Sequence, residues 1–240
     1  MKQLALDFAS RPLPMLDNFI AGRNGELLAN LRRLAAGQAS ERFLYLWGRP
    51  GSGRSHLLKG LVTALRRAGT AAVYISCAAG TWPADGLERV DCVALDDVDR
   101  LDEEGQIAAF DLYNALRERE GALLAGGAAP PVQLKLREDL VTRLAWGLVY
   151  QVHALSDEEK AGALADYAAE RGFQLLPEVC DYLLTRSNRD LPSLLATLDA
   201  LDRYSLETKR PVTVPLVREL LHAVERPNTG LGLQDSGSRG

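Results

Sequence analysis

The sequence predicts an α/β fold, with a parallel β-sheet covered by helices on both faces, followed by an all-helical region. Over residues 43–152, short apolar runs alternate with segments of helical periodicity, which is typical of such a sheet. From about residue 155, apolar residues recur only at helical spacing and no strand pattern returns. With 240 residues, 47% of them hydrophobic, the chain is long enough for one large domain or two small ones.

Composition and charge narrow the functional classes. A formal net charge of −4 gives no global field that attracts nucleic acid. The three cysteines are widely spaced and match neither a metal site nor a disulfide framework, so we expect a reducing, cytoplasmic setting. The three histidines are isolated and form no ligand cluster. No apolar run reaches the roughly 18 residues of a membrane helix, and no signal peptide is recognisable, so we expect no membrane association.

Five strands are expected in the α/β region. Each is a short run of aliphatic, β-branched or aromatic residues bounded by turn residues or helical segments. The predicted strands cover residues 43–47, 71–76, 90–95, 122–125 and 148–152. Helices are predicted before and between them, where apolar residues recur every three or four positions. They cover residues 24–35, the segment that follows residue 55, and residues 106–117 and 140–146.

The region after residue 155 is expected to contain four helices. A capping box at residues 156–159 opens the first, which is expected to run to about Arg171 and to stop at Gly172. Pro177 begins the second, which ends near residue 185. Apolar residues at helical spacing predict the other two at residues 191–205 and 214–224. Residues 226–240 are rich in Gly, Ser and Asn, and we expect a disordered tail there.

A glycine-rich loop follows the first predicted strand. Residues 48–55 match the phosphate-binding pattern G-x-x-x-x-G-K-[ST], except that Arg54 stands in the lysine position. The glycines let backbone N–H groups approach phosphates, the following helix adds its positive dipole end, and Ser55 is a candidate ligand of Mg²⁺. The alternative is an ordinary glycine-rich turn, but the strand–loop–helix context favours a nucleotide site. Because a guanidinium is a planar fork and not a point charge, the usual contact across the β- and γ-phosphates is altered.

Two acids close the third predicted strand. Asp96 and Asp97 come directly after an apolar run, at the end of the sheet where ligands of α/β proteins bind. In a phosphoryl-transfer site, one acid holds Mg²⁺ and a neighbour orients the attacking water, so we assign the metal to Asp96 and the water to Asp97. The alternative is a solvated acidic turn, since four further acids follow within seven residues.

Together these motifs resemble the AAA+ ATPases, and within them the DnaA/Hda family, with the closer likeness to its Hda-type regulators. The resemblance covers roughly residues 3–224. It implies a P-loop AAA+ core with a five-stranded parallel sheet and a C-terminal helical lid. The implied boundaries are an N-terminal peptide and linker at 1–14, the nucleotide-binding domain at 15–154, the lid at 155–225 and the tail at 226–240.

The cofactors that the resemblance implies are ADP or ATP with Mg²⁺. The implied nucleotide-contacting residues are Phe19 and Ile20 beside the adenine, then Gly48, Pro50, Gly51, Ser52, Gly53, Arg54, Ser55 and His56.

Two arginines gain a role through the same resemblance. The segment at residues 139–144 matches the arginine-finger segment of the family, which makes Arg143 a finger that acts on a neighbour's nucleotide. The segment at residues 183–191 resembles the lid helix that carries the sensor-2 arginine, here Arg189. Read without the resemblance, either arginine is a surface charge, and Arg143 pairs with Asp139 one helical turn earlier.

One segment departs from the family pattern. DnaA-like proteins place a polar sensor-1 residue before the Pro130–Pro131 pair, whereas this chain has Ala128 and Ala129 there. Alanine can neither position a water nor contact a γ-phosphate. Together with Arg54, this argues against an autonomous ATPase and favours bound ADP over ATP.

The N-terminus contains a short motif. Gln3, Leu4, Leu6 and Phe8 stand ahead of Pro12 and Pro14, which impose an extended path. They resemble the peptide by which bacterial replication proteins bind the DNA polymerase III sliding clamp (beta subunit). The alternative is a strand end that packs onto the folded body.

The favoured function is therefore a negative regulator of replication initiation that binds the sliding clamp and stimulates hydrolysis of DnaA-bound ATP. The alternative is a DnaA-like DNA-binding initiator or a helicase-loader ATPase. DnaA reads DNA through a helix-turn-helix domain after its lid, and no such segment follows residue 225, so we expect no direct sequence-specific DNA binding. The resemblance leaves homo-oligomerisation open.

Overall fold

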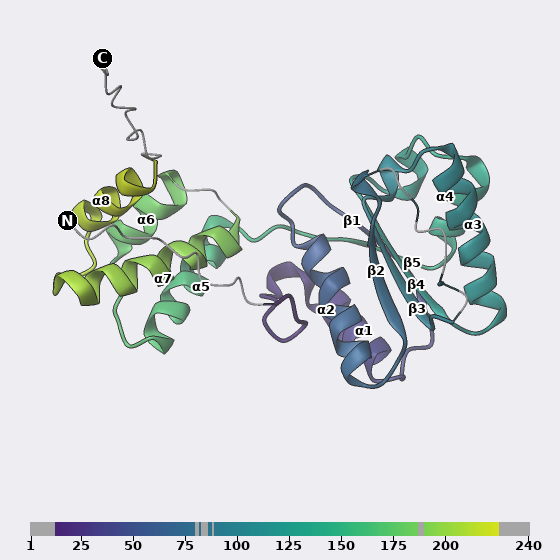
Figure 1. Ribbon diagram of the computed structural model, residues 1–240, viewed down its shortest axis with the longest axis horizontal. Coiled ribbons are helices and arrows are strands. Elements are labelled where there is room, and N and C mark those ends of the chain that lie inside the picture. The colour runs from purple at the N-terminus through teal and green to yellow at the C-terminus, as the bar shows by residue number, and fades with distance from the viewer. Residues whose placement is uncertain (1–12, 80–81, 83–85, 88, 187–189, 226–240) are drawn as a thin grey trace, which may run out of the picture. The chain divides into compact units, whose positions relative to one another are not determined.

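The computed structural model describes residues 13–79, 82, 86–87, 89–186 and 190–225. The chain divides into two compact units after Ser156 (Figure 1). The first is the predicted α/β unit and the second is the predicted all-helical unit.

The α/β unit is built on a five-stranded, all-parallel sheet. Its strands are β1 (Phe43–Trp47), β2 (Ala72–Ser76), β3 (Cys92–Asp96), β4 (Ala122–Gly127) and β5 (Leu148–Gln151). They lie in the order β2-β3-β4-β1-β5. The central strands β3 and β4 are buried along their whole length, as expected for parallel strands covered on both faces.

Helices cover the two faces of the sheet, as Figure 1 shows. On one face lie α1 (Gly25–Ala35) and α2 (Arg54–Arg67), and on the other α3 (Glu103–Glu118) and α4 (Glu138–Trp146). Each face has its own hydrophobic cluster, with Leu31, Leu58 and Leu124 in the first and Tyr113, Leu116 and Leu140 in the second. Short 3₁₀ turns occur at Gly22–Asn24, Cys77–Ala79, Val98–Arg100 and Pro131–Gln133.

The helical unit contains α5 (Asp157–Glu170), α6 (Pro177–Arg186), α7 (Leu191–Thr208) and α8 (Val214–Glu225). Leu164, Leu183, Leu198 and Val217 are fully buried in a core that the four helices share. This unit therefore has a hydrophobic core of its own. Within the described ranges of both units, no helix is long and apolar enough to cross a membrane.

The fold class predicted from the sequence is confirmed, and the differences concern boundaries. Helix α3 begins at Glu103, three residues before the predicted start, because the Asp102 side chain caps it by accepting a hydrogen bond from the Gly105 backbone N–H (2.8 Å). Strand β4 continues past the predicted end to Gly127, because it stays paired with β1 as far as Trp47. The pairing of β4 with β1 on one side and β3 on the other places the ends of these three strands side by side.

Candidate nucleotide-binding site

The glycine-rich loop has the backbone conformation that its composition predicts. It joins β1 to α2, and Gly51 and Gly53 have positive φ angles of 80° and 96°. A Cβ on Gly48 would lie 2.7 Å from both the Ser52 hydroxyl and the Val152 carbonyl, so a side chain does not fit there. Ser52 is 6% exposed, and its buried hydroxyl has no hydrogen-bond partner within the described residues. The loop thus offers a buried polar atom next to the N-terminus of α2.

The Arg54 side chain is engaged by the first residue of the loop and by the ends of β3 and β4. Its Nε donates to Asp96 Oδ1 (3.1 Å) and its Nη2 to Asp97 Oδ1, which forms two ion pairs. Its Nη1 donates to the Gly48 carbonyl (3.2 Å) and the Gly127 carbonyl (2.6 Å). One guanidinium therefore ties the loop to the ends of β3 and β4.

The end of β4 leaves room for this guanidinium. A Cβ on Gly126 would lie 3.0 Å from Arg54 Cδ, and a Cβ on Gly127 would lie 2.1 Å from the Tyr45 hydroxyl. That hydroxyl donates to the Ala129 carbonyl (2.8 Å). The paired glycines are thus required by close packing and not by backbone strain.

The acids at the end of β3 are held by several donors. Asp96 is 1% exposed, and besides Arg54 it accepts from the Tyr74 hydroxyl (2.9 Å) and the Asp97 backbone N–H (3.0 Å). Burial raises the pKa of Tyr74 well above its usual value, and the charges of Asp96 and Asp97 raise it further. Burial also raises the pKa of Cys77 to about 12, with the same carboxylates contributing. The site is therefore rich in negative charge that Arg54 partly neutralises.

A third acid contacts the backbone at the position where the family pattern has its sensor-1 residue. Asp99 accepts a hydrogen bond from the Ala128 backbone N–H (3.0 Å). Neither Ala128 nor Ala129 offers a side-chain donor or acceptor, so their polar contacts are made by the backbone alone.

The segment predicted to border the adenine lies against the loop. The Phe19 ring would be 2.7 Å from a Cβ on Gly53, and it lies 5.6 Å from the His56 ring. The His56 Nε2 contacts the Met15 carbonyl (2.9 Å). Burial lowers the pKa of His56, and the Met15 hydrogen bond only partly opposes this. Ile20, also predicted to contact the base, is 37% exposed.

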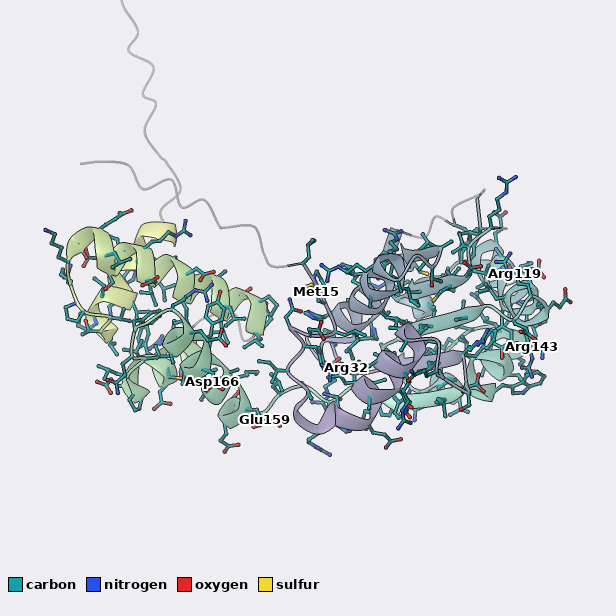
Figure 2. All side chains as sticks on the ribbon, turned by 90° about the horizontal axis from the view of Figure 1, so that it is seen from below. Met15, Arg32, Arg119, Arg143, Glu159 and Asp166 are labelled. Atoms are coloured by element: carbon teal, nitrogen blue, oxygen red, sulfur yellow. The ribbon has the colours of Figure 1, made fainter. Side chains whose placement is uncertain are left out.

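Arg143 lies elsewhere in the unit. Figure 2 shows it well away from Met15, which contacts His56 beside the loop. Its guanidinium carbon lies 4.1 Å from the centre of the Trp146 ring and 5.4 Å from that of Phe110. The alternative pairing with Asp139 is wrong, because Asp139 pairs with Arg137 (2.8 Å).

The loop and the acids differ in how well they fit the predicted cofactors. The loop fits a phosphate, because it combines positive-φ glycines, a buried hydroxyl without a partner and the start of a 14-residue helix. Asp96 fits Mg²⁺ poorly, because three of its roughly four acceptor positions already accept hydrogen bonds. Ser55 lies half-buried at the second position of α2. The described residues contain no cluster of three or more His, Cys, Asp or Glu that could hold a metal.

Some predicted residues fall outside the described part of the chain. These are the N-terminal motif of Gln3, Leu4, Leu6 and Phe8, and the sensor-2 candidate Arg189. Conversely, the sequence did not identify Tyr45, Tyr74, Asp99, Gly126 and Gly127 as parts of the site. The Gly-Gly pair at the end of a buried strand was the available signal.

Comparison with known proteins finds the same fold in several replication and recombination proteins. Residues 157–221 match the family model described as the lid domain of Hda. Domain III of the replication initiation protein DnaA from Thermotoga maritima aligns with a TM-score of 0.70 and 20% identity, over 90% of this chain and 100% of that one. DnaA from Aquifex aeolicus, in a structure bound to AMPPCP, aligns with a TM-score of 0.68 and 21% identity, over 82% of this chain and 67% of that one. RuvB from Thermotoga maritima aligns with a TM-score of 0.66 and 15% identity, over 88% of this chain and 72% of that one.

Proposed function

We propose that the chain, whose residues 157–221 match the lid domain of Hda and whose fold is that of DnaA, is a member of the Hda/DnaA family of AAA+ proteins. Its proposed function is to regulate replication initiation by stimulating hydrolysis of DnaA-bound ATP. The observation that carries this proposal is the location of Arg143. This arginine lies away from the chain's own glycine-rich loop, at the end of α4 and just before β5. This location supports a role on a nucleotide held by another molecule.

The surroundings of Arg143 suit this role. The aromatic rings of Trp146, Phe110 and Tyr113 lie within 4.1–5.8 Å of its guanidinium carbon. Stacking on ring faces restricts a long side chain without using its hydrogen-bond donors. Asp139 is paired with Arg137, so it does not compete with a phosphoryl group for the Arg143 guanidinium. The fork of Arg143 stays available for an anionic phosphoryl group.

The chemistry that Arg143 performs is charge neutralisation. During hydrolysis a water oxygen bonds to the γ-phosphorus while the bond from that phosphorus to the ADP oxygen breaks. In the transition state, negative charge is spread over the three equatorial oxygens of the transferred phosphoryl group. A guanidinium placed on those oxygens stabilises the transition state more than the ground state. The DnaA that receives this help is left with ADP and is inactive as an initiator.

The chain's own nucleotide has a different role in this proposal. Arg54 is engaged by Asp96 and Asp97, and alanines occupy the sensor-1 position. Arg54 is therefore not free to contact a γ-phosphate, and the side chain at position 128 cannot position a water. The site is proposed to hold adenine nucleotide, with ADP preferred to ATP, as a structural cofactor. DnaA bound to AMPPCP, a related AAA+ protein, supports the assignment of an adenine nucleotide.

The N-terminal motif supplies the proposed location of the reaction. Gln3 offers amide hydrogen bonds, while Leu6 and Phe8 offer apolar side chains to a pocket of the DNA polymerase III sliding clamp. Tethering to a clamp on DNA would raise the effective concentration of this chain near newly replicated DNA. Initiation would then be repressed once synthesis has begun.

The decisive experiment exchanges Arg143 for alanine in a DnaA–ATP hydrolysis assay with DNA-loaded clamp. Because arginine fingers contribute on the order of 10³–10⁵ in rate, stimulation should be lost almost completely. Arg143→Lys should not restore it, since a point charge lacks the planar fork. Lys135→Ala is the matched control: it removes an exposed cation just ahead of the same helix, leaves the Arg137–Asp139 pair in place and should retain stimulation. Near-normal stimulation by a folded Arg143→Ala variant would refute the proposal.

A further inference from the structure

We propose that the guanidinium of Arg54 is the resident cation of the nucleotide site, occupies the place of a divalent metal at Asp96, and lets the site bind a nucleoside diphosphate without Mg²⁺. The inference rests on the nucleotide binding of the proposed function. It concerns how this chain neutralises its own acids, which is independent of any effect on DnaA.

The first support is the completeness of the contacts around the guanidinium. Four of its five N–H donors are used, two on carboxylates and two on the Gly48 and Gly127 carbonyls. The side chain is only 11% exposed. A buried cation surrounded by anionic and carbonyl oxygens is the arrangement that proteins use for bound metal ions.

The second support is that three of the roughly four acceptor positions of the buried Asp96 carboxylate are already used. Its Oδ1 accepts from Arg54 and from the Asp97 backbone N–H, and its Oδ2 accepts from the Tyr74 hydroxyl. A divalent metal at Asp96 would compete with this buried ion pair, and displacing the pair would leave the guanidinium without one of its carboxylate partners. Breaking a buried pair in this way is costly.

The third support is the shape of the sheet at this position. Gly126 and Gly127 leave the space that the arginine stem and guanidinium fill, and any Cβ there would collide with Arg54 or Tyr45. The guanidinium also joins the ends of three strands or loops that are distant in sequence. Arg54 is thus built into the domain and not held ready for a phosphate.

The phosphates have other donors in the loop. Positive φ angles at Gly51 and Gly53 turn the backbone at the start of α2, and the buried Ser52 hydroxyl beside them has no described partner. Backbone N–H groups and a hydroxyl need no metal to bind an anion. A diphosphate brings less charge to the nearby carboxylates than a triphosphate, so this mode of binding favours ADP.

The test is an equilibrium titration of the full-length protein with a fluorescent ADP, once in Mg²⁺ and once in excess EDTA. We expect the two dissociation constants to agree within about threefold, since the resident guanidinium already neutralises Asp96. ADP affinity that falls about tenfold or more in EDTA would overturn the inference. In parallel, Mn²⁺ added to the ADP-bound protein should bind no more tightly than it binds free ADP, as measured by electron paramagnetic resonance.

Arg54→Lys is the informative variant. An ammonium on a flexible stem cannot contact Asp96, Asp97 and both carbonyls together, so metal should gain access to Asp96. ADP binding by this variant should weaken about tenfold or more in EDTA relative to Mg²⁺. Arg66→Lys is the matched control, because Arg66 lies on the same helix and contacts the Ala72 carbonyl instead. A variant that binds ADP equally well with and without Mg²⁺ would overturn the assignment to Arg54.

The outcomes separate this inference from the proposed regulation of DnaA. Metal-independent ADP binding without stimulation of DnaA would support the inference and refute the regulatory proposal. Stimulation of DnaA by a protein that needs Mg²⁺ to bind ADP would support the regulatory proposal and refute the inference. Failure to bind ADP under either condition would overturn the inference together with the nucleotide part of the proposed function.

Discussion

Single side chains at the nucleotide site owe their roles to partners far away in the sequence. Arg54 contacts Asp96, Asp97 and Gly127, which are between 42 and 73 residues away along the chain. The sequence shows that Arg54 stands in the lysine position of the loop, which raised the question of whether a positively charged side chain still contacts the β- and γ-phosphates. Its actual partners were not visible, because they depend on the sheet order that places β1 and β3 on either side of β4.

His56 gives a prediction about pH. Burial holds its pKa below the usual value in the folded protein, whereas the unfolded ring binds a proton at a pH of about 6.5. The unfolded state then takes up more protons, so the stability contributed above about pH 6.5 is lost as the pH falls toward the folded pKa. The melting temperature should fall between about pH 7.5 and 5.5, and it should fall less for His56→Gln, whose amide can still donate to the Met15 carbonyl.

The control for this prediction is the same exchange at His153. The contacts of His153 with Asn24 are made by its backbone and not by its ring, so the variant should keep the wild-type pH profile. Calorimetry over the pH series decides the matter. Identical slopes for wild-type and His56→Gln proteins would show that His56 does not couple stability to pH.

At the scale of elements, periodicity predicted which elements exist better than where they start and end. All five strands and eight α-helices of the described chain were expected, because each contributes an apolar face to one of the three cores. The start of α3 was missed because its first turn contains acids and Gly105 and carries no apolar signal. Local capping by Asp102, and not burial, decides that boundary.

That cap gives a second prediction. Asp102→Ala removes the acceptor for the Gly105 N–H, so the free energy of unfolding should fall by about 0.5–2 kcal/mol. Asp111→Ala is the matched control, since Asp111 is an exposed acid on the same helix and its loss should cost less than about 0.5 kcal/mol. Urea denaturation followed by circular dichroism measures both. Equal effects at the two positions would mean that the α3 cap contributes nothing specific.

At the scale of the whole molecule, the cores of the two units are built from different parts of the sequence. The cores of the α/β unit draw on residues from Leu16 to Val152, and the core of the helical unit on residues from Leu164 to Leu220. The sequence predicted a boundary at residue 154 from the loss of strand patterns, and the chain divides after Ser156. The change of periodicity was informative because a helical core and a parallel sheet demand different spacings of apolar residues.

The N-terminal motif, which falls outside the described residues, gives the last prediction. Gln3 and Leu6 precede Pro12 and Pro14, whereas the first buried residue of the described core is Leu16. Changing both Gln3 and Leu6 to alanine should therefore abolish binding to the purified sliding clamp and leave the melting temperature unchanged. A double variant at Lys2 and Ser10, on either side of the motif, controls for altering the segment at all and should bind as the wild type does. Calorimetric titration with the clamp gives the affinity, and thermal melting gives the stability.

The competing interpretation, a strand end packed on the body, predicts the opposite pair of results, with binding retained and a melting temperature lowered by the loss of buried Leu6. Because the two interpretations differ in both measurements, one double variant distinguishes a tether from a piece of the fold.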